Sequence, residues 1–262
     1  MLFFLALLLT ASLTLSCLRA IPQSPLPLAA HISLLLAVCW LGNLAFSRAF
    51  HAKSNPESVL ISALILALII SPSGQLSWAG LELPLLAGLW AMASKYLFGR
   101  RLLFNPAAFG VFCAGLLTKS AASWWVGNYW LFGLVLVGGF FLLRKMRCFD
   151  LVLSFCGSVL VVSTLLAPAG YAWMFDSEIV TRSAMMFFAF VMLTEPRTMP
   201  LGWGWRIAFG VLVGIFYAPA THFGSLRFSP EIALLMGNLF AAAVKWRRRR
   251  FVALQRAVAH TT

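Results

Sequence analysis

Charged residues are scarce in this chain. Only 10% of its 262 residues are Asp, Glu, Lys or Arg, and seven of these are acidic. Apolar residues make up 61% of the sequence, and the mean hydropathy is +0.91. A soluble globular domain needs far more polar surface to cover its core. The composition therefore excludes a soluble domain and predicts an integral membrane protein.

The motifs of several enzyme classes are also missing. The chain has no phosphate-binding glycine loop, no HExxH zinc motif and no visible Ser-His-Asp arrangement. Its five cysteines show no CxxC spacing, and buried apolar thiols are their expected state. His31 and His222 stand singly on apolar segments, whereas haem ligation needs facing pairs. The sequence thus predicts no metal site and gives no support to nucleotide hydrolysis.

Apolar stretches are abundant. Three of them, which begin at Glu57, Pro106 and Ser183, are shorter than the roughly 20 residues that a helix needs to cross a bilayer. Such short segments persist only where other helices surround them. The stretches are 1–18, 28–47, 57–71, 78–96, 106–118, 124–143, 150–168, 183–194, 203–220 and 229–244. We predict an all-α integral membrane fold with about ten transmembrane segments, the first of them retained as a helix.

The basic residues indicate an orientation. Ten passes place both termini on the same side of the membrane. Of the 20 lysines and arginines, four fall on the opposite side: Arg19, Lys119, Arg182 and Arg227. The other 16 share the side of the termini, which the positive-inside rule identifies as the cytoplasm. We therefore expect a multi-pass inner-membrane protein with both termini in the cytoplasm.

The net charge of +13 raises the question of an anionic partner. The cations lie at segment ends and in the tail, not on one soluble face, so topology explains them and no nucleic-acid partner is expected. The segment Lys245–Arg250 reads KWRRRR. It suits either a simple anchor for the last helix or an anionic-lipid site worth about 1 kcal/mol per cation. The anchor is the simpler interpretation.

The spacing of prolines indicates an internal repeat. Pro72 and Pro196 end apolar runs, and 34 residues after each comes a proline that opens another run, Pro106 and Pro230. The two pairs are offset by 124 residues, and the members of each matched pair fall on opposite sides of the membrane. Short proline-interrupted segments in two halves are typical of inverted repeats with broken helices. We expect one transmembrane domain, 1–262, with repeats at about 1–120 and 121–244 and a basic cytoplasmic tail at 245–262.

Carboxylates in apolar segments are candidates for function because they are costly to bury. Glu57 and Glu231 lie in the first turns of their expected helices, where a capping role is a simpler explanation than an ion or proton site. Tryptophans near the span ends are expected to form belts at the membrane interface. These are Trp124, Trp125, Trp203 and Trp205.

Glu195 and Asn105 stand out for other reasons. Glu195 ends its segment, where the helix dipole disfavours an anion, so a cation or a ligand must compensate it. The candidate cations are Arg197, Lys95 and Arg100. Asn105 before Pro106 is a good helix start, and a helix that starts inside the membrane leaves backbone donors free for an anion or a ring of carbonyls. A structural cap remains the simpler role for Asn105.

Three motifs resemble the NqrB/RnfD family, the membrane subunits of sodium-pumping NADH:quinone reductase and of the Rnf ferredoxin:NAD complex. They are KYLFGRRLLFNPAAFG at 95–110, FFAFVMLTEPRTMPLGWGWRIAFGVLVGIF at 187–216 and SPEIALLMGN at 229–238. The resemblance runs from about Glu57 to Val244 with a gap. The family usually has Thr-Asp-Pro where this chain has Thr194-Glu195-Pro196. The resemblance implies a fold of two inverted five-helix halves and a function in electron transfer that uses flavin.

The resemblance implies two flavin sites, of which this chain departs from the first. The family attaches FMN to a threonine in a Ser-x-Ala-Thr segment on the extracytoplasmic side. Here that connection is reduced to Thr118–Asn128, and Ser123 stands in the acceptor place. A turn of small residues explains this string more simply than covalent flavin. The second implied flavin, riboflavin or FMN, is noncovalent. We expect it where five polar residues converge: Lys95, Asn105, Thr194, Glu195 and Thr198.

Three functions are compatible with these observations. The first is a membrane subunit of an Rnf/Nqr-like electron-transport system that binds a noncovalent flavin and relays electrons. Because the sequence shows no soluble NAD or iron–sulfur domain, it would work with other membrane and soluble redox subunits. The second is a small-solute or ion transporter or channel built on the same inverted repeat. The third is a scaffold that has lost its cofactor. Fold alone does not decide among them.

Overall fold

The structure is a computed structural model that describes residues 1–73, 78–98, 103–166, 183–219, 221–223 and 226–259. The elements are α1 (Leu2–Cys17), α2 (Pro25–Ala49), α3 (Pro56–Ile69), α4 (Trp78–Leu97), α5 (Pro106–Thr118), α6 (Tyr129–Met146), α7 (Phe149–Leu166), α9 (Ser183–Phe187), the π-helix η1 (Phe188–Met192), α10 (Trp203–Tyr217), β1 (His222–Phe223), β2 (Leu226–Arg227) and α11 (Pro230–Ala259). Each of the ten predicted apolar stretches contains a helix, which confirms the helical class. Two strands of two residues each, β1 and β2, pair antiparallel and were not predicted from the sequence.

Three of the described helices, α2, α6 and α7, are long and apolar enough to cross a membrane. Helices α1, α3, α5 and α10 are apolar but shorter. These lengths, together with the composition, identify a helical membrane protein. The count of ten spans, the inverted repeat and the orientation stay predictions.

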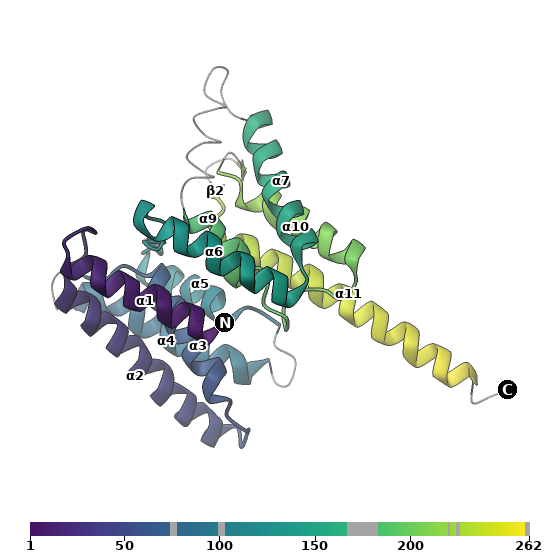
Figure 1. Cartoon of the computed structure of the whole chain (residues 1–262). Coiled ribbons are helices and arrows are strands. Elements are labelled where there is room, and N and C mark those ends of the chain that lie inside the picture. The colour runs from purple at the N-terminus through teal and green to yellow at the C-terminus, as the bar shows by residue number, and fades with distance from the viewer. Residues whose placement is uncertain (74–77, 99–102, 167–182, 220, 224–225, 260–262) are drawn as a thin grey trace.

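The first and second halves of the chain form two neighbouring groups of helices (Figure 1). The purple and blue helices α1–α4 lie together, and the green and yellow elements from α7 to α11 lie on the other side of α5 and α6. Helix α5 packs on α4, and it also contacts α11 in the other half. The helix that opens at Pro106 is therefore central to the molecule.

Glycines allow the closest helix contacts in both halves. A Cβ atom on Gly110 of α5 would lie 2.3 Å from the carbonyl oxygen of Ala87 in α4. On the other side of the molecule, a Cβ atom on Gly210 of α10 would lie 2.5 Å from the carbonyl oxygen of Leu151 in α7. Small residues at such contacts let helix backbones approach, which is how membrane helices gain packing energy.

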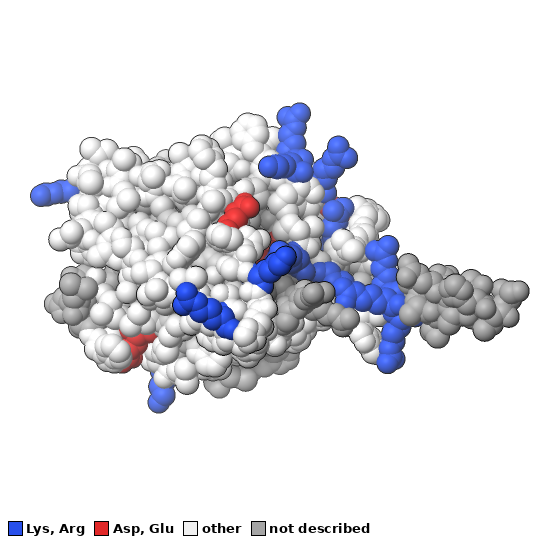
Figure 2. All heavy atoms as spheres, turned by 90° about the horizontal axis from the view of Figure 1, so that it is seen from below, with Lys and Arg blue, Asp and Glu red and all other residues white. Residues whose placement is uncertain are grey.

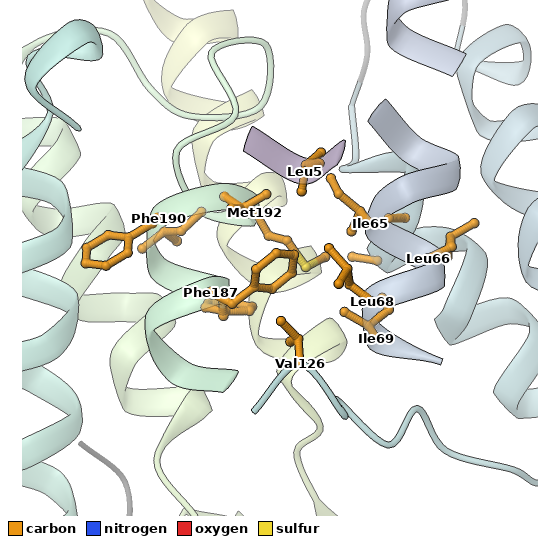
Figure 3. Packing of buried hydrophobic residues seen from close by; sticks show 14 of the residues in the cluster. Leu5, Ile65, Leu66, Leu68, Ile69, Val126, Phe187, Phe190 and Met192 are labelled. Carbon is orange, nitrogen blue, oxygen red and sulfur yellow. The ribbon is translucent and has the colours of Figure 1, made fainter. Parts of the chain in front are cut away.

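The apolar core lies where α3 faces the short pair α9–η1 (Figure 3). Leu68 and Ile65 of α3 point toward Phe187 and Met192, and Val126 closes the cluster from below. All five side chains are buried. Because α3 from Ser62 to Ile69 and all of η1 are buried among other helices, these short helices need not reach either membrane surface.

The C-terminal end of α3 is completed by the segment that precedes α6. The backbone N–H of Trp124 donates to the Ile69 carbonyl oxygen at 2.8 Å, and that of Val126 donates to Leu68 at 3.2 Å. The indole Nε1 of Trp125 donates to the Ala67 carbonyl oxygen at 2.8 Å. A helix end leaves carbonyls without partners, and in a membrane each one is costly. Residues 124–126 thus allow α3 to stop inside the protein.

This arrangement corrects two expectations. Trp124 and Trp125 are buried, with 9% and 7% exposure, so they are not part of an interface belt as the sequence suggested. Residues 124–128, expected to open a span, lie before α6, which starts at Tyr129. The N–H groups of Trp124 and Val126 donate to α3, and those of Gly127 and Asn128 donate within the segment. Trp203 and Trp205 are exposed, as a belt requires.

Candidate functional site

Asn105 joins three elements at the start of α5. Its side-chain Oδ1 accepts from the backbone N–H of Ala108 at 3.1 Å, which is the expected cap. Its own backbone N–H donates to Oδ1 of Asn238 in α11 at 2.8 Å. Its Nδ2 donates to Oε2 of Glu195 at 2.8 Å and to the Met192 carbonyl oxygen at 3.5 Å. One buried asparagine therefore connects α5, α11 and the turn after η1.

The turn after η1 holds Glu195 by local hydrogen bonds. Thr194 Oγ1 donates to the Phe190 carbonyl oxygen at 2.6 Å. The Glu195 carbonyl oxygen accepts from the backbone N–H groups of Thr198 and Met199, both at 3.1 Å, and from Thr198 Oγ1 at 3.3 Å. Thr194 and Thr198 are both buried. Their hydroxyls therefore shape the turn that presents the Glu195 carboxylate.

The π-helical geometry of η1 belongs to the same turn. The Leu193 N–H donates to the Phe188 carbonyl oxygen at 2.9 Å, a bond to the fifth residue back. The last carbonyls of η1 are then satisfied by the Asn105 and Thr194 side chains. Single π-helical turns are frequent at functional sites.

Lys95 of α4 reaches α3 instead of bonding to Glu195. Its Nζ donates to the Ser58 carbonyl oxygen at 2.7 Å and contacts Ser58 Oγ at 3.1 Å. It also attracts the Glu195 carboxylate through space, as do Arg197 and Lys245. The hydrogen bond from Asn105 and these cations compensate the carboxylate that the helix dipole disfavours. Arg100, the other predicted cation, lies outside the described residues.

A cavity of about 260 Å³ lies against this network. It lies at the N-termini of both α3 and α5, where Asn55 and Asn105 are the capping residues. Apolar residues line part of it, and two asparagines, two serines, two glutamates and one arginine line the rest. The lining residues are Met1, Asn55, Glu57, Ser58, Ile61, Ser62, Ile65, Asn105, Pro106, Ala107, Glu195, Pro196 and Arg197.

The five predicted site residues thus fall into three groups. Asn105 and Glu195 bond to each other and line the cavity. Lys95 is joined to the cavity through Ser58. Thr194 and Thr198 support the turn of Glu195. Asn105 and Glu195 therefore come together as predicted. Lys95, Thr194 and Thr198 do not line the cavity; Lys95 and Thr198 bond to residues that do, and Thr194 directly precedes Glu195 in the chain.

Sequence reasoning missed two contributors. Asn55-Pro56 repeats the pattern of Asn105-Pro106, so the same cap-and-proline signal marks a second helix start at the cavity. Asn238 is fully buried in the apolar helix α11, and a lone amide in such a helix is itself a signal of a polar contact. Its Nδ2 has no hydrogen-bond partner within the part of the chain that the structure describes.

Ser123 and Glu231 lie apart from the cavity. Ser123 is exposed, and its Oγ donates to the Ile69 carbonyl oxygen at 3.4 Å. Glu231 is buried with 4% exposure, and its Oε1 accepts from Trp124 Nε1 at 2.8 Å. At this helix start, Ser229 Oγ accepts from the Ile232 N–H at 3.5 Å. Ser229 therefore caps α11, and the Glu231 carboxylate binds the Trp124 indole and also interacts with Ser229 and with its own backbone N–H at this helix start.

The chain is similar to known proteins over part of its length. It matches the D-type subunit of the ion-translocating oxidoreductase complex from Haemophilus influenzae strains PittEE, PittGG and 86-028NP. Each is 28% identical over 123 residues, which is 47% of this chain and 33% of the relative. No family model matches the chain. The match thus covers about a third of the length of these relatives. This likeness agrees with the expected resemblance to RnfD subunits. The expected resemblance to NqrB subunits remains a prediction.

Proposed function

We propose that this protein is a membrane subunit of an Rnf-like electron-transport system and that its cavity binds a noncovalent flavin. The proposal is supported by the likeness to a subunit of an ion-translocating oxidoreductase complex. It is carried by one observation, the Asn105–Glu195 hydrogen bond at the wall of a partly apolar cavity. The other membrane and soluble redox subunits that such a system needs are part of the same proposal.

The cavity suits a ring better than a whole nucleotide. Its volume of about 260 Å³ is just below the usual range for ligand pockets, about 300–1,000 Å³. Ile61, Ile65 and Pro106 offer apolar surface for the faces of an isoalloxazine ring. Glu195 and Ser62 offer polar groups for its edge. When bound, a flavin would supply the ability to take up electrons and pass them on.

The charges of the lining favour an uncharged flavin. Two helix N-termini and Arg197 would attract a phosphate, but Glu57 and Glu195 line the same space and repel one. The two carboxylates already offset the positive field of the helix ends. Riboflavin therefore fits this cavity better than FMN.

The protein groups have separate tasks in this proposal. The Glu195 carboxylate accepts a hydrogen bond from an N–H group at the ring edge, since its Oε1 is not the atom bound to Asn105. Asn105 fixes the orientation of that carboxylate. Lys95 holds the start of α3, the opposite wall, by its bonds to Ser58. The buried turn with Thr194 and Thr198 keeps these groups at constant positions.

The proposal includes the predicted topology: ten spans in two inverted five-helix repeats, in the inner membrane, with both termini cytoplasmic. The matched prolines and the two broken helix ends support it. One end, after η1, is completed by Asn105, and the other, at Ile69, by residues 124–126. On this topology the cavity opens toward the cytoplasm.

A small-solute or ion transporter is the second candidate, because two carboxylates line a cavity between broken helices. The segment 124–126 weighs against it. Its three residues are buried and bonded to α3 at the opposite end of the core, where a through-path would have to open. A relay of electrons needs no such path.

Absorption spectra of the purified full chain test the proposal. We expect protein prepared with added riboflavin to show a flavin spectrum that acid precipitation releases into the supernatant. Asn105→Ala and Glu195→Ala should each lower the flavin-to-protein ratio at least about tenfold, since each removes a hydrogen bond to a charged group. Ser123→Ala is the matched control and should leave the ratio unchanged.

Two outcomes would contradict the proposal. A folded protein that stays colourless with both riboflavin and FMN would favour transport or a scaffold. Colour that remains in the acid pellet and disappears in Ser123→Ala would mean covalent attachment at Ser123, and the cavity would lose its assigned role.

A further inference from the structure

Helix α11 continues well past the body of the molecule. Between residues 230 and 250, whose burial the structure describes, the last buried residue is Ala241, and the helix runs on to Ala259. In Figure 1 this yellow end projects away from all other elements. The sequence suggested a span that ended near residue 244 and a separate tail. In the structure the residues of the expected tail, as far as Ala259, continue the same helix.

Four arginines surround this helix at the level where it leaves the body. Residues of an α-helix are separated by about 100° around its axis. Arg247, Arg248, Arg249 and Arg250 are consecutive and exposed, so their side chains leave the helix in all directions. Figure 2 shows basic side chains along this part of the molecule. We call Arg247–Arg250 the arginine collar.

An exposed tryptophan lies at the same level. Trp246 is 53% exposed, and the guanidinium carbon of Arg250 lies 4.0 Å from the centre of its ring. Cations stacked on tryptophan occur widely, and tryptophan itself prefers the headgroup layer of a membrane. The arginine collar and the neighbouring Trp246 are thus the two residue types that are typical of a membrane interface.

No acidic residue follows Glu231 in the sequence. Within the described part of the chain, none of the four collar guanidinium groups forms an ion pair with a carboxylate. Four adjacent like charges repel one another, and an external anion would relieve that repulsion. An anionic partner outside this chain would therefore stabilise the collar.

We propose that the arginine collar binds the headgroups of anionic phospholipids in the membrane surface that α11 leaves. The argument is geometric. A protein docking on one side of the helix would meet only one or two of the four arginines. A layer of headgroups around the helix meets all of them at once, and each cation near an anionic membrane surface adds to the attraction.

Lys245 has a different role from the collar. Its Nζ donates to the Arg197 carbonyl oxygen at 2.7 Å, and its charge attracts Glu195. One hydrogen bond therefore joins the root of the collar to the turn that carries Glu195. The lipid proposal stands independently of what the cavity binds.

Lipid retention by the purified full chain tests the proposal. The protein is passed over a size-exclusion column in zwitterionic micelles that contain a small share of phosphatidylglycerol, and the phosphatidylglycerol that elutes with it is counted by mass spectrometry. We expect the variant in which all four collar arginines become Gln to retain at least about tenfold less. About 0.5 M NaCl should have a similar effect on the wild type.

Two further variants serve as controls. Replacing the four arginines by Lys keeps the charge and should preserve most of the retention, because a lipid surface responds chiefly to charge. The double variant Arg144→Gln/Lys145→Gln removes two exposed cations at the end of α6 and should lose much less lipid than the collar Gln variant. All variants should elute at the same volume, since the collar is exposed.

The proposal fails if the Gln variant retains as much phosphatidylglycerol as the wild type. It also fails if the Arg144/Lys145 variant loses as much, because the effect would then be one of overall charge. A protein partner that the Gln and Lys variants both lose, with lipid retention unchanged, would overturn it in favour of an acidic protein.

Discussion

The indole Nε1 of Trp124 donates a hydrogen bond to Oε1 of Glu231 at 2.8 Å, and both residues are buried. The same tryptophan donates its backbone N–H to the end of α3. One residue thus completes the end of a short helix in the first half and binds the carboxylate at the start of α11. The Asn105–Glu195 bond joins the halves in a similar way, with an amide at a helix start and a carboxylate from the other half.

Trp124→Phe tests the first of these bonds. The phenyl ring keeps most of the apolar contact with Phe188, but the Glu231 carboxylate loses the indole N–H as a donor. We expect a loss of about 1.5–3 kcal/mol in stability, the usual cost for a hydrogen bond to a charged group. In detergent this should lower the Tm by several degrees, as measured by circular dichroism.

Glu231→Gln is the companion variant, because its side-chain oxygen can still accept from the indole. It should lose clearly less than Trp124→Phe. If both variants had the same Tm as the wild type, the bond between Trp124 and Glu231 would contribute nothing to stability.

Asn105→Ala should destabilise the protein more than the same change at the matched residue Asn55. Both asparagines cap a helix that begins with proline. Asn55 is exposed and accepts one weak bond of 3.4 Å, whereas the Asn105 side chain makes three contacts and is only 2% exposed. We expect about 1 kcal/mol or less for Asn55→Ala, and about 2–4 kcal/mol for Asn105→Ala, where Glu195 also loses a partner.

Chemical denaturation of both variants in the same detergent provides the comparison. Equal losses at the two positions would show that Asn105 acts as a cap alone. In that case the bond to Glu195 would have no energetic weight.

Much of the architecture could be predicted because it follows from local signals. Apolar length and the Asn-Pro pattern placed the start of α5, and the predicted start at Pro106 is correct. The convergence of Asn105 and Glu195 was predicted from the resemblance to a family and from the order of the broken segments. These signals are contained in short stretches of sequence.

The role of residues 124–126 could not be predicted in this way. A tryptophan pair at the edge of an apolar stretch has the pattern of an interface belt. What buries the pair is a set of free carbonyls at the end of α3, more than fifty residues earlier in the chain. Nothing near Trp124 in the sequence indicates that partner. The continuation of α11 was missed for a related reason, since a run of arginines has good helix propensity but no apolar signal.

Gly110→Ala should disrupt the contact between α4 and α5. The added Cβ atom would lie 2.3 Å from the Ala87 carbonyl oxygen and 2.9 Å from the Ala91 Cβ atom, and a backbone oxygen cannot move aside without shifting the helix. We expect a loss of about 1–3 kcal/mol or more from overpacking. The Tm should fall, and flavin retention should fall with it, because α5 begins at the cavity.

Gly133→Ala in α6 is the matched control. A Cβ atom there meets nothing within 4 Å, so the better helix propensity of alanine should raise stability slightly. If Gly110→Ala were as stable as Gly133→Ala, α4 and α5 would not pack as closely at residue 110 as the structure shows.

Labelling of single cysteines tests whether α6 spans the membrane and in which orientation. In a chain whose five native cysteines are replaced, Ser123→Cys and Lys145→Cys place one thiol at each end of α6, and both positions are exposed. The predicted topology puts residue 123 outside the cell and residue 145 in the cytoplasm. A maleimide that cannot cross the membrane should therefore label Ser123→Cys in intact spheroplasts and Lys145→Cys only after lysis. The reverse labelling pattern would mean that the orientation is opposite to the predicted one and that the cavity beside Glu195 faces the outside of the cell. Labelling of both positions from one side would mean that α6 does not span the membrane, and the ten-span arrangement would then be untenable.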